Sequence, residues 1–76
     1  MEELVAYIAR ALVDHPDQVR VERTERDGAV VLQLHVAHED LGKVIGRQGR
    51  VVRALRTLVR AGGSKRSERT LLEIVE

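Results

Sequence analysis

The four residues Gly46-Arg47-Gln48-Gly49 have the types and the spacing best suited to binding chemistry in this 76-residue chain. Glycine adopts backbone angles that other residues avoid, and it lets a second backbone approach closely. The second glycine comes directly before a predicted helix, whose free N–H groups and dipole attract anions. Arg47 adds a positive charge at the tip. The pattern therefore predicts a site for a phosphodiester backbone.

A stripe of arginines follows this loop along the predicted helix. At 100° per residue the arginines fall within about 120° of the helix circumference. They are Arg50, Arg53, Arg56 and Arg60. The other side of the helix is apolar and holds Val51, Val52, Ala54, Leu55, Leu58 and Val59. We expect Arg50 and Arg53 to track further phosphates, whereas a solvated helix face is the preferred interpretation of Arg56 and Arg60.

The charge of the chain is concentrated in one segment, although its net value is only +1. Residues 1–39 carry a net charge of −4, residues 40–69 a net charge of +7, and residues 70–76 a net charge of −2. A basic segment in a nearly neutral chain indicates a local anion site and not a generally basic surface.

Other residues with chemical potential do not form a pattern that indicates a metal site or an enzyme. His35 and His38 are three residues apart on or just after a predicted strand, which points them to opposite faces. The chain has no cysteine, so we expect no metal and no cofactor. Ser64 and Ser67 have no evident base nearby, and no phosphate-binding loop of the G-x-x-x-x-G-K-[ST] type occurs. We therefore expect no catalytic residue and no enzymatic activity.

The elements that must position the loop can be predicted from hydrophobic periodicity and turn residues. Pro16 prevents the first helix from continuing, and Asp27-Gly28 is a strong signal for a hairpin turn. Gly62-Gly63 is expected to end the helix that follows the loop. Helices are predicted over 2–14, 39–45 and 50–61, strands over 18–26, 29–36 and 69–75, and a polar loop over 64–67.

The order α-β-β-α-α-β predicts an α+β fold with a mixed three-stranded sheet. The hairpin makes the first two strands antiparallel, while the last strand returns after two helices and can lie parallel to strand 29–36. The helices then cover one face of the sheet. Val30, Leu32, Leu34 and Val36 are expected to form the core face. No repeat or linker divides the chain, so residues 1–76 are interpreted as a single domain.

A resemblance to a known family rests on this loop and on the element order. The run Val44-Ile45-Gly46-Arg47-Gln48-Gly49 resembles the I-G-x-x-G signature of KH domains, and the order of elements resembles the type II arrangement of bacterial KH proteins. The segment LGKVIGRQGRVVRALRTLVR is similar to the small bacterial RNA-binding KhpA family in particular. The resemblance extends over essentially the whole chain.

The resemblance implies that the chain binds single-stranded RNA. In KH domains the two loop glycines hold the nucleic-acid backbone, and about four nucleotides lie in a groove beside the loop. Val44, Ile45 and Val52 are expected to line that groove, and Lys43 to flank the backbone. The full set of expected RNA-binding residues is Lys43, Val44, Ile45, Gly46, Arg47, Gln48, Gly49, Arg50, Val52 and Arg53.

The single aromatic residue limits the expected affinity. Tyr7 lies in the first predicted helix, far from the loop in sequence, and is expected to be a half-buried packing residue. Base stacking, worth about 1–3 kcal/mol per base, is then not available to the loop. We expect weak binding of low specificity by the lone domain, and tight binding only with a second domain or a partner.

Three wider roles are compatible with the resemblance. One is a global post-transcriptional regulator or RNA chaperone that works with a KH partner. A second is a dimerisation module, because the family pairs with itself or with a larger Jag-type KH protein, and the region near Leu58 is a candidate contact. A third is a ribosome-associated assembly factor. DNA binding also stays open, because phosphate contacts alone do not exclude it.

The sequence also bears on the compartment. The absence of cysteine fits a reducing cytosol. The first 15 residues lack the basic start and the unbroken apolar run of a signal peptide, and no stretch approaches the ~20 apolar residues that span a bilayer. We therefore expect a cytoplasmic protein without membrane contact.

Overall fold

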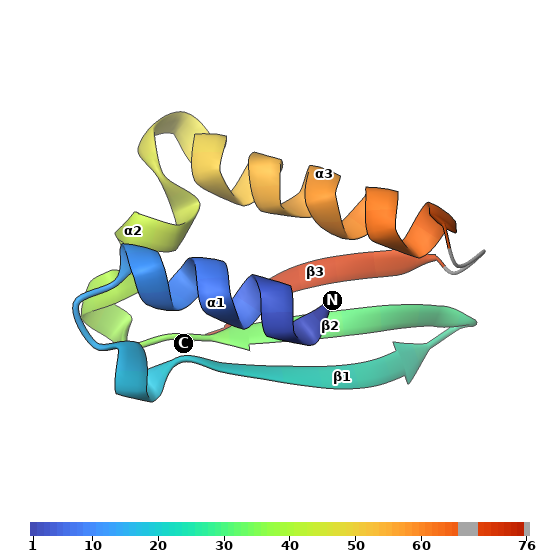
Figure 1. Cartoon of the computed structure of the whole chain (residues 1–76), viewed down its shortest axis with the longest axis horizontal. Coiled ribbons are helices and arrows are strands. Elements are labelled where there is room, and N and C mark those ends of the chain that lie inside the picture. Colours follow the sequence, from blue (N-terminus) through green and yellow to red (C-terminus); the bar gives the residue numbers. More distant parts are fainter. Residues whose placement is uncertain (66–68, 76) are drawn as a thin grey trace.

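Two layers make up the structure, a three-stranded sheet and a layer of helices on one of its faces (Figure 1). The computed structural model describes residues 1–65 and 69–75. The helices are α1 (Glu2–Leu12), α2 (Leu41–Ile45) and α3 (Arg50–Lys65), and the strands are β1 (Arg20–Arg26), β2 (Ala29–His35) and β3 (Thr70–Val75). Three single 3₁₀ turns lie between them, at Pro16–Gln18, His38–Asp40 and Arg47–Gly49. The predicted order α-β-β-α-α-β is confirmed.

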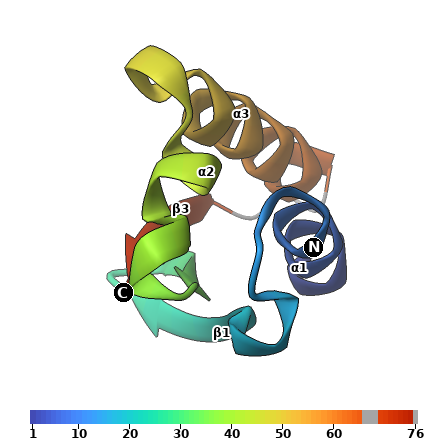
Figure 2. The same ribbon diagram turned by 90° about the vertical axis from the view of Figure 1, so that its left-hand side faces the viewer.

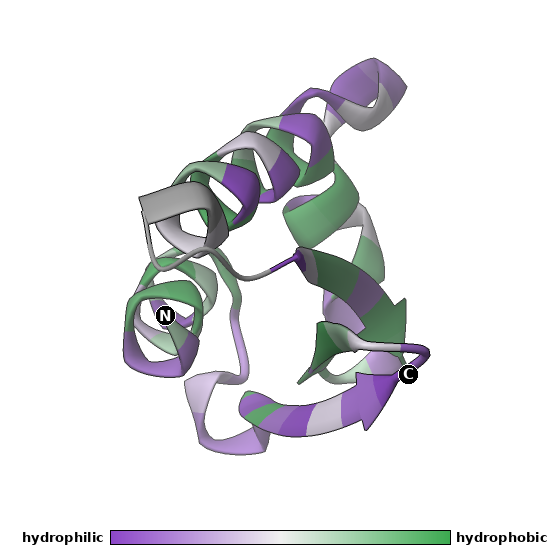
Figure 3. Ribbon diagram, turned by 90° about the vertical axis from the view of Figure 1, so that its right-hand side faces the viewer, coloured by the Kyte–Doolittle hydropathy of each residue, from purple (hydrophilic) through white to green (hydrophobic). Residues whose placement is uncertain are grey.

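The sheet has the order β1-β2-β3 and is mixed, as predicted. β1 and β2 are antiparallel and are joined at Asp27-Gly28, where both residues have positive φ (53° and 79°), as a tight hairpin turn requires. β2 and β3 are parallel, with Val30 opposite Thr70 and Leu34 opposite Ile74. β2 is therefore the central strand. β1 is hydrophilic along most of its length, whereas β3 is largely hydrophobic (Figure 3).

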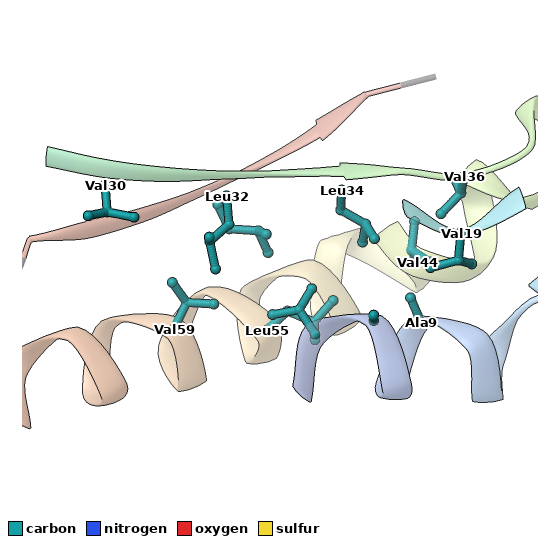
Figure 4. Close-up of a cluster of buried hydrophobic side chains, with 12 residues drawn as sticks. Ala9, Val19, Val30, Leu32, Leu34, Val36, Val44, Leu55 and Val59 are labelled. Atoms are coloured by element: carbon teal, nitrogen blue, oxygen red, sulfur yellow. The ribbon is translucent and has the colours of Figure 1, made fainter. Parts of the chain in front are cut away.

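The core lies between β2 and the helices. The alternate residues of β2 that were expected to face it are all buried, and so is Val36 just beyond the strand. Figure 4 shows these side chains directed at Leu55 and Val59 of α3 and at the helix α1. Among the described residues, no helix is long and apolar enough to cross a bilayer.

The first helix is shorter than predicted, ending at Leu12 and not at Asp14. Val13 is already extended, and Pro16 begins a 3₁₀ turn whose last residue is Gln18. The strand β1 consequently starts at Arg20, two residues later than predicted. A proline at the first position of a helical turn is favoured because its fixed φ suits the turn and its missing N–H is not needed there.

The predicted end of the third helix at Gly62-Gly63 is wrong, because α3 continues through both glycines to Lys65. A Cβ atom on Gly62 would collide with the side chain of Met1. This glycine therefore allows the start of α1 to pack closely against α3, and it does not end the helix. Of the polar loop predicted over 64–67, the first two residues belong to α3, and residues 66 and 67 lie outside the described part of the chain.

Candidate nucleic-acid interface

Residues 46–49, called the GxxG loop below, join α2 to α3 at a sharp bend that stands out from the molecule (Figure 2). Three of the four residues have positive φ: Gly46 (78°), Gln48 (56°) and Gly49 (75°). The backbone N–H of Gly49 donates to the carbonyl of Gly46 at 3.1 Å, which closes the turn. Arg47 and Gln48 are exposed at its tip. The loop is therefore an exposed bend, neither part of a strand nor buried.

The two glycines serve different purposes. A Cβ atom on Gly46 would lie 2.9 Å from the backbone nitrogen of Val51, so only glycine fits at this position. At Gly49 the nearest atom to such a Cβ would be 3.8 Å away. Gly49 is therefore required by its backbone angle alone, because other residues rarely adopt positive φ.

The side chain of Arg53 is exposed and turns back onto the loop. Its Nε–H donates to the carbonyl oxygen of Gly49 at 3.3 Å, and an Nη2–H donates to the carbonyl oxygen of Gln48 at 2.5 Å. The sequence predicted Arg53 as a phosphate contact and missed these bonds. Gly49 and Arg53 are four residues apart, a spacing that places them on neighbouring turns of a helix. This spacing was the sequence feature from which the contact could have been predicted.

The other arginines near the loop have exposed charges. Within residues 1–65 and 69–75, no acidic side chain forms an ion pair with Arg47, Arg50, Arg56 or Arg60. All four are exposed, and the last three lie along α3 as predicted. This row of positive charge is therefore accessible to an anion.

The far end of the row borders a shallow hollow between α3 and β3. Among the described strands β3 pairs with β2 alone, so its outer edge faces this hollow. Its lining combines charged and apolar side chains, namely Arg56, Arg60, Thr70, Leu71, Leu72 and Glu73. Arg56 and Arg60 are thus placed beside an open strand edge as well as on a solvated helix face.

Lys43 is held in an ion-pair network. Its Nζ lies 2.8 Å from Oδ2 of Asp14 and 3.8 Å from Oδ1 of Asp40. The hydrogen bond to the Asp14 carboxylate and its charge raise the pKa of Lys43 above the usual value. The predicted contact of Lys43 with the RNA backbone would therefore compete with its ion pair to Asp14.

Asp40 is a buried carboxylate that the sequence did not single out as a structural residue. It lies at the N-cap of α2 but makes no side-chain hydrogen bond to that helix. It accepts hydrogen bonds from the backbone N–H groups of Asp14 (3.2 Å) and His15 (3.0 Å). Burial by itself raises the pKa of Asp40, but these hydrogen bonds and the charges of His15 and Lys43 outweigh burial and lower it. Asp40 thereby connects the end of α1 to the start of α2.

The three apolar residues predicted to line a groove have different environments. Val44 is 0% exposed and belongs to the core, and Val52 is also buried. Ile45 is 40% exposed and lies directly before the GxxG loop. Val44 and Val52 were expected to line the groove, but both side chains are buried, Val44 because α2 turns it inward. Ile45 is the apolar side chain of this set that is accessible beside the loop.

Tyr7 is 71% exposed, so its prediction as a half-buried packing residue is wrong. It lies on the outer side of α1, whose buried residues are Val5, Ala6 and Ala9. In the part of the chain that the structure describes, no group of three His, Cys, Asp or Glu side chains is arranged to hold a metal ion.

Comparisons with known proteins agree with this arrangement. The family model described as KhpA/KhpB, KH domain, matches residues 2–74. The chain is 55% identical over 75 residues to the RNA-binding protein KhpA of Treponema pallidum (strain Nichols), in an alignment that covers 99% of this chain and 94% of the relative. It is 49% identical over 76 residues to the RNA-binding protein KhpA of Listeria monocytogenes serovar 1/2a, with both chains covered completely.

A third relative is the RNA-binding protein KhpA of Bacillus subtilis (strain 168), which is 46% identical over 76 residues. That alignment covers 100% of this chain and 94% of the relative. The family match extends over nearly the whole chain, and the loop, the element order and the mixed sheet are those expected of a KH domain. The chain therefore belongs to the KhpA/KhpB family of KH domains.

Proposed function

We propose that this chain binds single-stranded RNA by holding the sugar-phosphate backbone on the GxxG loop. The observation that carries the proposal is the exposed bend at the N-terminus of α3, flanked by the exposed cations of Arg47 and Arg50. Helix N-termini attract phosphate through their free N–H groups and their dipole. The relatives of this chain are named as RNA-binding proteins, which supports RNA as the ligand.

Each part of the loop has a specific role in this proposal. Gly46 and Gly49 carry no side chain, so a phosphate can approach the main chain closely. Arg47 and Gln48 contact the backbone from the tip, and Arg50 contacts it from the first turn of α3. Ile45 packs against a base. Val44 and Val52 do not contact the RNA in this proposal, and their buried side chains support α2 and α3.

The lone domain is proposed to bind weakly. Tyr7 is the single aromatic residue of the chain and lies on α1, so stacking on the bases near the loop does not contribute. Phosphate contacts give little sequence information. A role on many transcripts, as a post-transcriptional regulator or RNA chaperone, is what the resemblance to the KhpA family implies, and low specificity is compatible with it. Pairing with a second KH domain would raise the affinity through avidity.

A second candidate function is pairing with another protein chain. Leu58 is 45% exposed on α3, although it belongs to the apolar side predicted for this helix. Ala54, one helical turn away on the same side, is exposed as well, so this part of α3 is suited to contact with a second copy or a larger KH protein. Analytical ultracentrifugation of wild type and Leu58→Asp tests this function, and a monomer at all concentrations of the wild type contradicts self-association.

Fluorescence anisotropy with a labelled single-stranded RNA of about ten nucleotides tests the RNA proposal. We expect the double variant Arg47→Asp/Gln48→Asp to lose binding while its thermal unfolding stays unchanged, because both side chains are exposed. A matched control is Gln18→Asp/Arg20→Asp, which changes the net charge equally at exposed positions away from the loop. Equal losses in both variants, or none in the first, would exclude the loop as the binding site. A DNA strand of the same sequence measures the preference for RNA.

A further inference from the structure

Arg53 contacts the two carbonyl groups on which the shape of the GxxG loop depends. Its Nε–H and Nη2–H groups donate to the carbonyls of Gly49 and Gln48, respectively. The planar guanidinium presents its N–H groups in a fixed fork, which suits two neighbouring acceptors. One side chain thus holds two consecutive peptide groups of the loop.

The loop needs such support because Gln48 has φ 56° and ψ 25°, a left-handed conformation. A residue with a Cβ rarely adopts this conformation without tertiary contacts. On one side the loop is confined by Val51, whose backbone nitrogen closely approaches Gly46. On the other side it is confined by Arg53. The two contacts together fix the backbone that the phosphate would meet.

Arg53 also changes the electrostatics of the loop. Carbonyl oxygens carry partial negative charge and repel a phosphate. The guanidinium covers two of these oxygens with a positive charge, at the same end of α3 where the helix dipole is positive. The loop surface is thereby made more favourable for an anion, although the Nε–H and one Nη2–H of Arg53 are engaged on the protein.

We infer that Arg53 is a positioning residue, which fixes the GxxG loop in the conformation that binds RNA and does not itself hold a phosphate. This inference rests on the proposed function. It differs from the assignment of Arg53 as a phosphate contact, because a phosphate contact contributes to the salt dependence of binding, whereas positioning acts through the two donors to the loop carbonyls.

The substitution Arg53→Lys tests whether the forked contact matters, because lysine keeps the charge but lacks the fixed fork. We expect it to weaken RNA binding about three- to tenfold, the effect of one or two lost hydrogen bonds. The slope of log K against log salt is expected to stay unchanged, because no phosphate contact is lost. The matched control Arg60→Lys, at an exposed position further along α3 that has no role in the proposed binding, should bind as well as wild type. Equal affinity of Arg53→Lys and wild type would overturn the inference.

Variants that remove the positive charge of Arg50 or of Arg53 give a second comparison. Arg50→Gln is expected to reduce the salt slope by about 0.7, the value for one phosphate contact on a single strand. Arg53→Gln should weaken binding without this reduction. A slope reduced equally in both variants would identify Arg53 as a phosphate ligand and contradict positioning.

A measurement without RNA distinguishes a failure of this inference from a failure of the proposed function. In the NMR spectrum, the coupling constant and the Cα shift of Gln48 report its left-handed conformation. We expect Arg53→Lys to move the coupling constant and the Cα shift toward values averaged over several conformations, and Arg50→Lys to leave both unchanged. Because asparagine tolerates positive φ, Gln48→Asn should bring position 48 back to left-handed values in the Arg53→Lys background. Unchanged Gln48 signals in Arg53→Lys would overturn positioning, whereas wild type that binds no RNA would overturn the proposed function.

Discussion

The backbone nitrogen of Val51 lies only 2.9 Å from the point where a Cβ atom on Gly46 would stand. This close approach places the first turn of α3 directly against Gly46, the residue that follows α2. The angle between the two helices at the GxxG loop is therefore fixed by a contact between backbones, which a side chain would disrupt.

The two loop glycines should differ when each is replaced by alanine. Gly46→Ala is expected to destabilise the fold by about 2 kcal/mol or more, because it combines positive φ with a clash against the backbone. Gly49→Ala, with free space around its Cβ, should cost about 1 kcal/mol. Urea unfolding of both variants measures the difference, and equal losses would contradict the contact between Gly46 and Val51.

The neighbours Val44 and Ile45 should give opposite results. Val44→Ala removes buried methyl groups and is expected to destabilise the fold by about 2 kcal/mol. Ile45→Ala removes a side chain that is largely solvated, so stability should change by about 0.5 kcal/mol or less, while RNA affinity falls. Thermal unfolding and anisotropy on both variants test the pair. A loss of RNA affinity in Val44→Ala greater than in Ile45→Ala would reverse the assignment.

The buried carboxylate of Asp40 should make stability depend on pH. Its folded pKa lies below the usual 3.8, so its contribution is present above the unfolded value and is lost as pH falls through the folded value. Asp40→Asn should therefore be less stable at neutral pH and should lose less stability below about pH 4. Denaturant unfolding at several pH values measures both effects, and the exposed Asp17→Asn serves as the control. Parallel pH profiles for wild type and Asp40→Asn would contradict this role.

Lys43 should contribute more to stability than to RNA binding. Its ammonium group lies 2.8 Å from the Asp14 carboxylate, so Lys43→Gln should destabilise the fold slightly and leave the salt slope of RNA binding unchanged. Arg47→Gln should leave the stability of the fold nearly unchanged and reduce the salt slope of RNA binding by about 0.7. If both variants reduce the slope, Lys43 exchanges Asp14 for a phosphate on binding. The raised pKa of Lys43 also means that its contribution is present below pH 10.5 and is lost as pH rises through the folded value.

Periodicity predicted the elements because the core contacts repeat regularly along the strands and helices. Val30, Leu32 and Leu34 alternate in sequence, and all three face the helices as expected. The loop was predicted because its glycines and flanking helices are adjacent in sequence. These features depend on neighbouring residues, which is why the sequence alone identifies them.

The features that were missed depend on residues far apart or on the shape of a turn. Gly62 was predicted to end the helix, but it lies inside α3 against the side chain of Met1, at the other end of the chain. Asp40 binds backbone groups 25 and 26 residues away. Arg53 reaches the loop carbonyls because Gln48 is left-handed, and no spacing rule predicts that angle.

The parallel pairing of β2 with β3 has a consequence for how fast the protein folds. Partners in this pair, such as Gln33 and Glu73, are 40 residues apart, whereas the β1–β2 hairpin closes locally. Long closures cost chain entropy before pairing compensates for it. We therefore expect docking of β3, which packs against α3, to be the slow event of folding, and Leu72→Ala to slow refolding in stopped-flow experiments. A chain in which β3 has not yet joined the sheet should then hold α3, and with it the GxxG loop, less firmly than the native protein does.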